Sequence, residues 1–183
     1  SLLKRGNSVT WIDYSHKLIK KVQTEGPEWK KNFIFMDARS LKFPSKTFDV
    51  YISPGVIEHF FEENEKVKIL TEAYRVLKDD GTLICIVPYM NIIKKIKYPF
   101  LKYKNDQLRR KGMAFYQFVY TRSELSRLLS VCNFKIKNIE LLGLHDTKVF
   151  RKKIVPKILQ NNKLLLRIFG TTICAICKKR TTI

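Results

Sequence analysis

The chain has 183 residues, of which 45% are hydrophobic and 12% are aromatic, and this composition excludes a disordered polypeptide and predicts one folded domain. Its 36 Lys and Arg residues outnumber 16 Asp and Glu residues, which gives a formal net charge of +20 at pH 7. This charge either attracts an anionic partner, such as nucleic acid, acidic phospholipid or a phosphorylated substrate, or only provides a basic solvated surface. The sequence shows no secretory signal pattern and no run of about 18 apolar residues, so we expect a cytoplasmic setting.

Short apolar runs predict buried strands in the first half of the chain, and amphipathic segments predict helices between them. A helix is expected to begin after Ser15 and to bury Leu18 and Ile19, and a second helix is expected over residues 65–77. Asp79-Asp80-Gly81 is expected to end the second helix. The predicted strands of this half are residues 9–13, 33–36, 48–52 and 82–87.

The second half continues the alternation. Thr121-Arg-Ser-Glu124 has the pattern of a capping box and predicts the start of another helix. Residues 134–142 and 171–177 predict the two final strands. Strands that alternate with helices in this way predict a doubly wound α/β fold around a mostly parallel sheet.

Cys174 and Cys177 form a CxxC pattern inside the last predicted strand. Residues three apart on a strand point to opposite faces, so these two thiols are not expected to converge on one metal ion. We therefore interpret them as buried structural cysteines and predict no metal site.

Polar residues follow three of the predicted strands, which are Asp13, Asp37, and Ser53 with the adjacent Pro54-Gly55. Ligands of open α/β sheets bind at the carboxyl ends of the strands, where an acid commonly accepts hydrogen bonds from ribose hydroxyls. A second acid one strand away can accept from an exocyclic amine such as that of adenine. Each acid alone also fits a turn or a helix cap, but together they indicate an adenosine-bearing ligand.

Several segments, taken in order, resemble successive motifs of the class I S-adenosylmethionine-dependent methyltransferases, and especially of their small-molecule group. The resemblance spans about residues 6 to 178, and no single motif in it is specific by itself. It implies a Rossmann-like sheet with an antiparallel last strand, in a single methyltransferase-like domain over residues 1–183. The matching segments are residues 9–15, 37–44, 48–53, 56–60, 74–83 and Cys132-Asn133-Phe134.

The resemblance also implies roles for individual residues. Asp13 would bind the ribose hydroxyls of S-adenosylmethionine and Tyr14 would pack on the adenosine, whereas Asp37 and the Ala38 amide would hold the adenine. The cofactor side of the site would be lined by Ser53, Gly55 and Val56. His59 and Tyr116 are the candidate catalytic residues, with His145 as a further candidate near the site. Glu58 is interpreted as capping its local helix.

The sequence departs from the family pattern at one point. It contains no Gly-x-Gly-x-Gly, and the family's first strand and glycine-rich loop would precede residue 1. We therefore expect a domain that lacks this strand and loop and is incomplete at its N-terminus, with either a gap in the sheet or an unusual strand pairing.

Two basic segments interrupt the pattern. Residues 91–115 interleave lysines and arginines with aromatic residues and are expected to form a lid over the acceptor, or else a solvated helical excursion. Residues 146–169 form a basic insertion before the last strand, which either covers the sheet or lies on an anionic membrane.

The leading hypothesis is methyl transfer from S-adenosylmethionine to a small-molecule, glycan or lipid-linked anionic acceptor, with possible peripheral membrane contact. An RNA methyltransferase is an alternative suggested by the charge, although nucleic acid is the less favoured partner because the sequence has no Asn-Pro-Pro-Tyr-like motif. A non-catalytic pseudo-enzyme is suggested by the missing loop, and a nicotinamide-dependent oxidoreductase is the weakest option.

Overall fold

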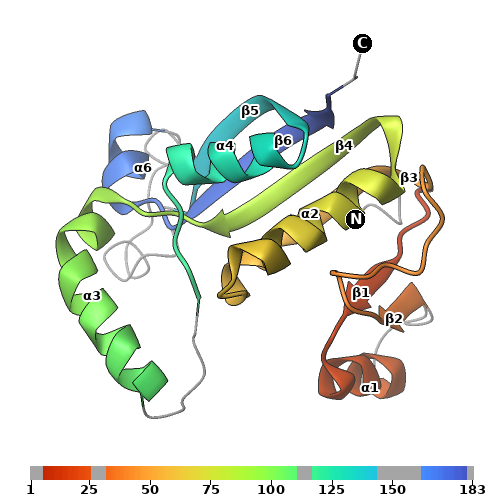
Figure 1. Cartoon of the computed structure of the whole chain (residues 1–183), viewed down its shortest axis with the longest axis horizontal. Coiled ribbons are helices and arrows are strands. Elements are labelled where there is room, and N and C mark those ends of the chain that lie inside the picture. Colours follow the sequence, from red (N-terminus) through yellow and green to blue (C-terminus); the bar gives the residue numbers. More distant parts are fainter. Residues whose placement is uncertain (1–5, 26–31, 111–116, 144–161, 181–183) are drawn as a thin grey trace.

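The computed structural model describes residues 6–25, 32–110, 117–143 and 162–180. Strands and helices alternate through most of these residues, as the sequence predicts (Figure 1). The strands are β1 (Trp11–Asp13), β2 (Phe33–Phe35), β3 (Phe48–Pro54), β4 (Leu77–Pro88), β5 (Phe134–Leu142) and β6 (Thr172–Lys179). The helices are α1 (His16–Glu25), the 3-10 helix η3 (Ile57–His59), α2 (Glu63–Val76), α3 (Ile92–Arg110), α4 (Arg122–Val131) and α6 (Lys163–Phe169).

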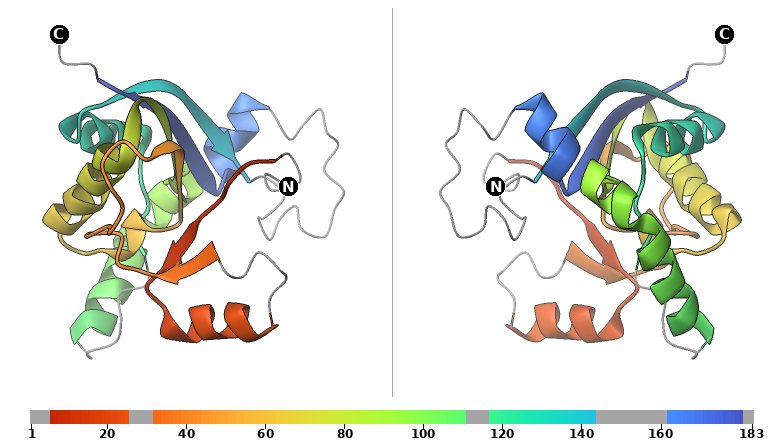
Figure 2. Two further views of the ribbon diagram at one scale, coloured as in Figure 1. Left: turned by 90° about the vertical axis from the view of Figure 1, so that its right-hand side faces the viewer. Right: turned by 90° about the vertical axis from the view of Figure 1, so that its left-hand side faces the viewer.

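The described strands form two separate sheets. β1 and β2 pair in parallel, and the second sheet has the order β3-β4-β6-β5. β3 and β4 are parallel, whereas β6 is antiparallel to both of its neighbours, which confirms the predicted antiparallel last strand. Figure 2 shows β1, β2 and α1 as a group beneath the larger sheet. The expected gap in a Rossmann-like sheet therefore lies between β1 and β3, which are not paired with each other.

One face of the larger sheet carries most of the hydrophobic core. α2 and α4 lie side by side over this face, where alternate residues of β4 and β6 are almost fully buried (Figure 1). The opposite face is less covered, since Val50 is 48% exposed and Ile52 is 44% exposed, and Ile52 lies in register with Ile84. The cross-strand register places Cys177 beside the buried Leu83 and Cys174 beside Ile86. The two cysteines therefore point to opposite faces, as predicted, and both are buried.

The start of β4 differs from the sequence prediction. α2 ends at Val76, and the segment containing Asp79-Asp80-Gly81 belongs to β4 instead of forming a separate turn. Phe48 lies opposite Leu77 but Val50 lies opposite Thr82, so β4 bulges between these two positions. A Cβ at Gly81 would lie 2.8 Å from the Lys78 carbonyl oxygen, which explains why the bulge needs glycine.

α4 begins and ends as its sequence predicts. The Thr121 hydroxyl accepts a hydrogen bond from the Glu124 amide at 3.2 Å, and the Glu124 carboxylate accepts one from the Thr121 amide at 2.8 Å. After the helix, Asn133 adopts a left-handed conformation with φ of 61°. Asparagine tolerates this conformation better than most residues, so it can close the turn where the resembling family has glycine.

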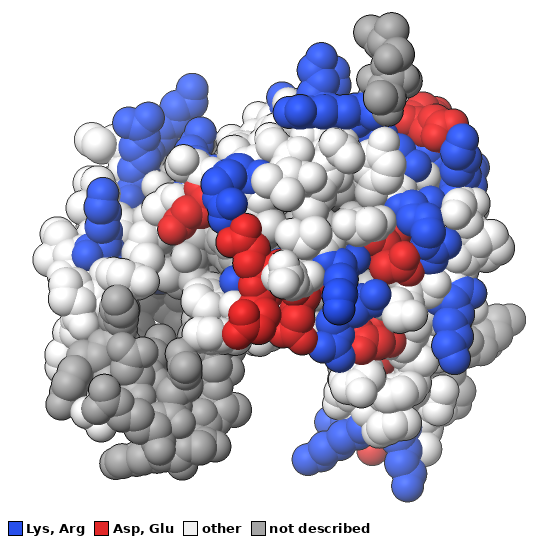
Figure 3. Space-filling model, viewed as in Figure 1, with Lys and Arg blue, Asp and Glu red and all other residues white. Residues whose placement is uncertain are grey.

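The two basic segments are described in part. Residues 111–116 and 144–161 lie outside the described residues, and so do the candidates Tyr116 and His145. The remainder of the first segment forms α3, in which Ile96 is 75% exposed and Phe100 is 70% exposed. The remainder of the second contains α6, and none of the described helices is long and apolar enough to span a membrane. Figure 3 shows basic side chains over α1, α6 and the β5-β6 region, whereas acidic ones gather where α2 begins.

Candidate functional site

Asp13 ends β1, and its side chain organises the turn into α1. One Asp13 carboxylate oxygen accepts a hydrogen bond from the Ser15 amide at 2.7 Å, and the Ser15 hydroxyl accepts one from the Leu18 amide at 3.2 Å. The Asp13 carbonyl oxygen accepts a bond from the Met36 amide at 3.1 Å, which ties the ends of β1 and β2 together. Asp13 is partly exposed, so its second carboxylate oxygen can still accept a hydrogen bond from a ligand.

Aromatic rings lie beside Asp13. Tyr14 is 65% exposed, and its ring stacks on that of Phe35 with the centroids 5.3 Å apart. His16 also stacks on Phe35, with the two ring centroids 3.6 Å apart. An exposed, stacked tyrosine next to a carboxylate is a suitable surface for a nucleoside, because a base packs on a flat ring while the ribose bonds to the acid.

Asp37 follows β2, and Arg39 binds its carboxylate. The Arg39 side chain contacts both Asp37 oxygens at 2.7–3.0 Å and donates from its other terminal nitrogen to Glu65 at 2.6 Å. These bonds to Arg39 hold the pKa of Asp37 below its usual value. The arginine also lies over the Phe60 ring at 5.3 Å and so joins the end of β2 to the segment after β3.

Arg39 changes what Asp37 can offer to a ligand. A carboxylate accepts about four hydrogen bonds, and Arg39 already uses most of this capacity through its side chain and its amide. Among the described residues, nothing accepts a hydrogen bond from the neighbouring Ala38 amide. The backbone at Ala38 is therefore the more available polar group at this strand end. The sequence did not reveal the part played by Arg39, although the Asp-x-Arg spacing is a usable signal.

Two buried polar atoms lack partners at the end of β3. Among the described residues, the Ser53 hydroxyl and one Glu58 carboxylate oxygen have no hydrogen-bond partner, although Ser53 is 2% exposed and Glu58 3% exposed. Gly55 lies between them with φ of +71°, and a Cβ there would lie 3.4 Å from the Glu58 carboxylate. An unsatisfied buried polar atom costs about 1–3 kcal/mol, so this pair marks a place where a ligand atom can stabilise the fold.

Glu58 is a stronger functional candidate than its sequence indicates. Burial raises the pKa of its carboxyl group. The expected capping role is not seen, since Val56 is at the N-cap of η3 and that helix has no side-chain capping hydrogen bond. The carbonyl oxygen of Glu58 accepts a bond from the Phe118 amide at 2.8 Å, which fixes η3 against the segment before α4. His59, in contrast, is exposed and lies at the end of η3. Burial therefore distinguishes Glu58 from His59 as a functional candidate, and burial cannot be read from the sequence alone.

A cavity of about 410 Å³ lies beside this segment, between α2, α3 and the start of α4. Lys95 and Tyr98 of α3 line it, so the segment for which a lid is expected contributes to this cavity. The Lys66 ammonium lies 3.8 Å from the Phe118 ring centroid in the same cavity, and its burial lowers its pKa. The Tyr120 hydroxyl, at 3.5 Å from the Ile57 carbonyl oxygen, joins the cavity to η3.

The fold agrees with the comparisons. Residues 1–85 match the family model described as a methyltransferase domain. A SAM-dependent methyltransferase from Methanosarcina mazei superposes with a TM-score of 0.73 at 22% identity, covering 99% of this chain and 86% of that one. This chain has the class I S-adenosylmethionine-dependent methyltransferase fold. This is the fold that the sequence motifs predict.

Other matches are more distant or shorter. The 1,6-didemethyltoxoflavin-N1-methyltransferase of Burkholderia thailandensis, solved with S-adenosylhomocysteine, superposes with a TM-score of 0.58 at 15% identity and covers 98% of this chain and 64% of that one. A 2-methyl-6-phytyl-1,4-hydroquinone methyltransferase of rice is 36% identical over 81 residues, 44% of this chain and 24% of the relative. Phosphatidylethanolamine N-methyltransferase of Cereibacter sphaeroides is 31% identical over 83 residues, 43% of this chain. The chain spans 39% of that relative.

Proposed function

We propose that this chain takes part in methyl transfer from S-adenosylmethionine to a small acceptor with a lipid part. The observation that carries the proposal is that three strands end in available polar groups, which are the Asp13 carboxylate, the Ala38 amide and, without a partner among the described residues, the Ser53 hydroxyl. Two curated relatives with matching segments are named for a phytyl hydroquinone and for phosphatidylethanolamine, which supports an acceptor of this class.

The residues present fit the adenosine end of the cofactor. Asp13 would accept hydrogen bonds from the ribose hydroxyls and Tyr14 would pack against the base, whereas the Ala38 amide would donate to the adenine ring. Asp37 would accept a hydrogen bond from the adenine with the part of its carboxylate that Arg39 does not use. Ser53, Gly55 and Val56 would line the cofactor side of the site. When bound, the cofactor supplies an electrophilic methyl group on a sulfonium sulfur.

Glu58 is the residue that we propose as the proton acceptor, ahead of His59 and Tyr116. An acceptor hydroxyl or amine that takes the methyl group loses one proton, and a carboxylate whose pKa is raised by burial is suited to receive it. The partner-free oxygen of Glu58 supports this role, because it has capacity for one further hydrogen bond. The rest of the catalysis would be positioning of the acceptor and exclusion of water.

Calorimetry with S-adenosylhomocysteine tests the cofactor part of the proposal. Asp13→Asn removes the charge that the ribose would contact, and hydrogen bonds to a charged group are worth about 1.5–3 kcal/mol, so we expect affinity to fall roughly 10- to 100-fold. Asp49→Asn is the matched control, since Asp49 is 78% exposed at the start of β3 and pairs with Lys78. Equal affinities of the two variants would contradict the assigned role of Asp13.

A non-catalytic binding function is the second candidate, and specific observations favour it. β1 and β3 belong to separate sheets, and Arg39 already occupies the Asp37 carboxylate. If the folded chain binds neither S-adenosylmethionine nor S-adenosylhomocysteine, this alternative is supported. If it binds the cofactor but Glu58→Gln leaves both binding and methyl transfer unchanged, the cofactor assignment stands and the role of Glu58 is wrong.

A further inference from the structure

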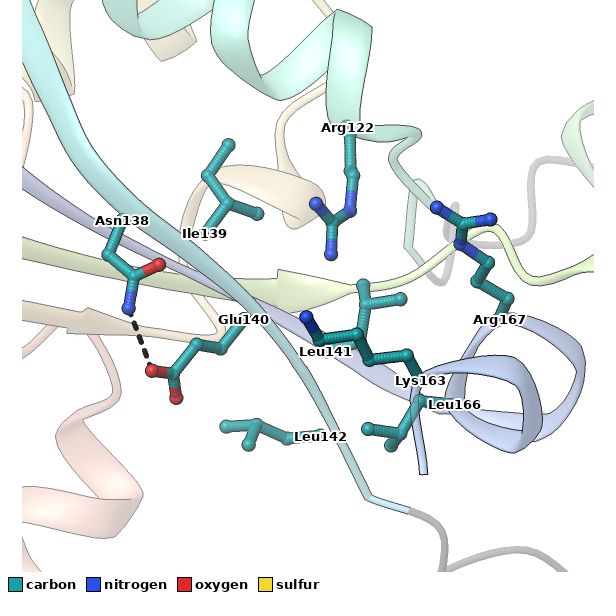
Figure 4. A pocket seen from close by; sticks show the side chains of 9 residues that line it. All are labelled: Arg122, Asn138, Ile139, Glu140, Leu141, Leu142, Lys163, Leu166 and Arg167. Carbon is teal, nitrogen blue, oxygen red and sulfur yellow. Dashed lines mark hydrogen bonds between the residues drawn. The ribbon is translucent and has the colours of Figure 1, made fainter. Parts of the chain in front are cut away.

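A second cavity lies against β5, which is the edge strand of the larger sheet farthest from β3. It has a volume of about 550 Å³ and lies between β5, the first residue of α4 and helix α6. Figure 4 shows three basic side chains, those of Arg122, Lys163 and Arg167, that extend toward the space between α4 and α6. Lys163 and Arg167 are four residues apart on α6, so they project from the same side of that helix.

Among the described residues, these three cationic side chains have no compensating partners. Within residues 6–25, 32–110, 117–143 and 162–180, none of their side chains forms a hydrogen bond or an ion pair. Of the described residues, Glu140 is the only acid that lines the cavity, and its carboxylate accepts a hydrogen bond from the Asn138 side chain at 2.7 Å. In Figure 4 this pair lies across β5 from Arg122. Three positive charges thus meet one carboxylate, and an anion in the cavity relieves their mutual repulsion.

The lining defines the chemistry of the anion. Two guanidinium groups can each make paired hydrogen bonds to phosphate oxygens, and the lysine adds a point charge. Ile139, Leu141 and Leu166 provide apolar surface in the same cavity, and its volume is within the usual range for organic ligands and exceeds that of an inorganic ion. The fitting ligand therefore carries a phosphoryl group on an apolar body.

The rim of the cavity extends this apolar character. Leu164, on α6 between two of the cations, is 64% exposed, and Leu142 at the end of β5 is 41% exposed. Exposed leucines beside cations on one helix are the pattern of a surface that contacts acyl chains near an anionic headgroup. We propose that this cavity binds the phosphoryl group of an amphiphilic phosphate ester, with its hydrocarbon part along α6.

The site stands apart from the residues assigned to methyl transfer. Leu142 pairs with Thr172 and Thr172 with Pro88, so the end of β5 lies at the same end of the sheet as the end of β3. β5 is three strands away from β3, a separation of about 14 Å. Binding of the phosphate ester requires no cofactor, so the proposal can fail or succeed independently of methyl transfer.

Two probes test the site with the whole chain. The first is sedimentation with phosphatidylcholine vesicles prepared with and without phosphatidic acid. The second is calorimetry with a water-soluble, short-chain phosphatidic acid, with inorganic phosphate for comparison. The cavity variant Arg122→Gln/Lys163→Gln/Arg167→Gln removes three charges from exposed side chains. We expect it to lose roughly 100-fold in affinity, since each basic residue near an anionic surface contributes about a factor of five.

A matched variant separates a built site from a general charge effect. Lys17→Gln/Lys20→Gln/Lys21→Gln removes the same charge from exposed positions on α1. The proposal requires that this variant keep most of the wild-type affinity. If the cavity variant alone loses affinity, and only for vesicles, the ligand is a membrane lipid. If it also loses affinity for the soluble ester, the phosphoryl group of a single molecule is sufficient for binding. Equal losses in the two variants, or no loss in the cavity variant, would overturn the proposal.

Discussion

Replacement of Arg75 by methionine is expected to lower the free energy of unfolding by about 1.5–3 kcal/mol. Arg75 lies on α2 and donates to the carbonyl oxygens of Leu41 and Phe43, both at 2.8 Å. It also bonds both carboxylate oxygens of Glu72, and Glu72 accepts from the Leu41 amide at 2.7 Å. These contacts fix the segment that joins β2 to β3 and thereby the position of Asp37.

The size of this loss in stability follows from the two hydrogen bonds that Arg75 donates to backbone carbonyl oxygens. Hydrogen bonds that involve a charged group contribute about 1.5–3 kcal/mol each, so two of them set an upper bound of about 3–6 kcal/mol. The Arg75 side chain is 33% exposed, and solvent screening lowers this bound to about half. Methionine keeps the packing of the aliphatic stem, so the loss reports mainly on the guanidinium.

Arg127→Met is the control, because it breaks a single ion pair with Glu63 in which the side chains are 60% and 55% exposed. We expect it to cost less than about 0.5 kcal/mol. Urea unfolding, monitored by circular dichroism and tryptophan fluorescence, measures the stability of both variants. An unchanged m-value shows that the substitutions alter stability and not the surface exposed on unfolding. A cost for Arg75→Met no greater than that for Arg127→Met would refute the anchoring role.

Three further predictions concern the core, the bulge and the buried acid. Phe134→Ala should cost about 3–5 kcal/mol in urea unfolding, since Phe134 is fully buried against Tyr74. Gly81→Ala should cost about 1–3 kcal/mol, because its Cβ would lie 2.8 Å from a carbonyl oxygen, and a neutral effect would contradict the bulge. Glu58→Gln should become increasingly more stable than wild type as pH rises above about 4.5, by at most about 1.4 kcal/mol per pH unit, because burial raises the folded-state pKa of Glu58. A stability difference that is independent of pH between 4 and 8 would contradict that last prediction.

Features set by neighbours in the sequence were predictable. The capping box at Thr121 and Glu124 depends on residues three apart, and the Ser15 cap depends on a similarly short interval. The opposite orientation of Cys174 and Cys177 follows from the period of a strand. Local rules of this kind need no knowledge of tertiary contacts, and the structure confirms them.

Features set by pairing between distant strands were not predictable. The Asp79-Asp80-Gly81 segment has the composition of a turn, yet pairing of Leu77 with Phe48 extends β4 through it. Glu58 and Arg39 were missed as functional candidates for a similar reason. The burial of Glu58 depends on the packing of η3 against Phe118, and the contacts of Arg39 depend on the position of Glu65.

The arrangement of the two sheets gives the ligand a structural role. Asp13 lies on the smaller sheet and Ser53 on the larger one, and these sheets share no strand pairing among the described residues. Side-chain contacts such as Arg39 with Glu65 provide the connection that the backbone does not. A ligand that contacts both Asp13 and Ser53 therefore adds a bridge between the sheets. Its binding stabilises the bridged arrangement by RT ln(1 + [L]/Kd), so protection of α1 and β1 from hydrogen exchange should rise with ligand concentration more than that of β6.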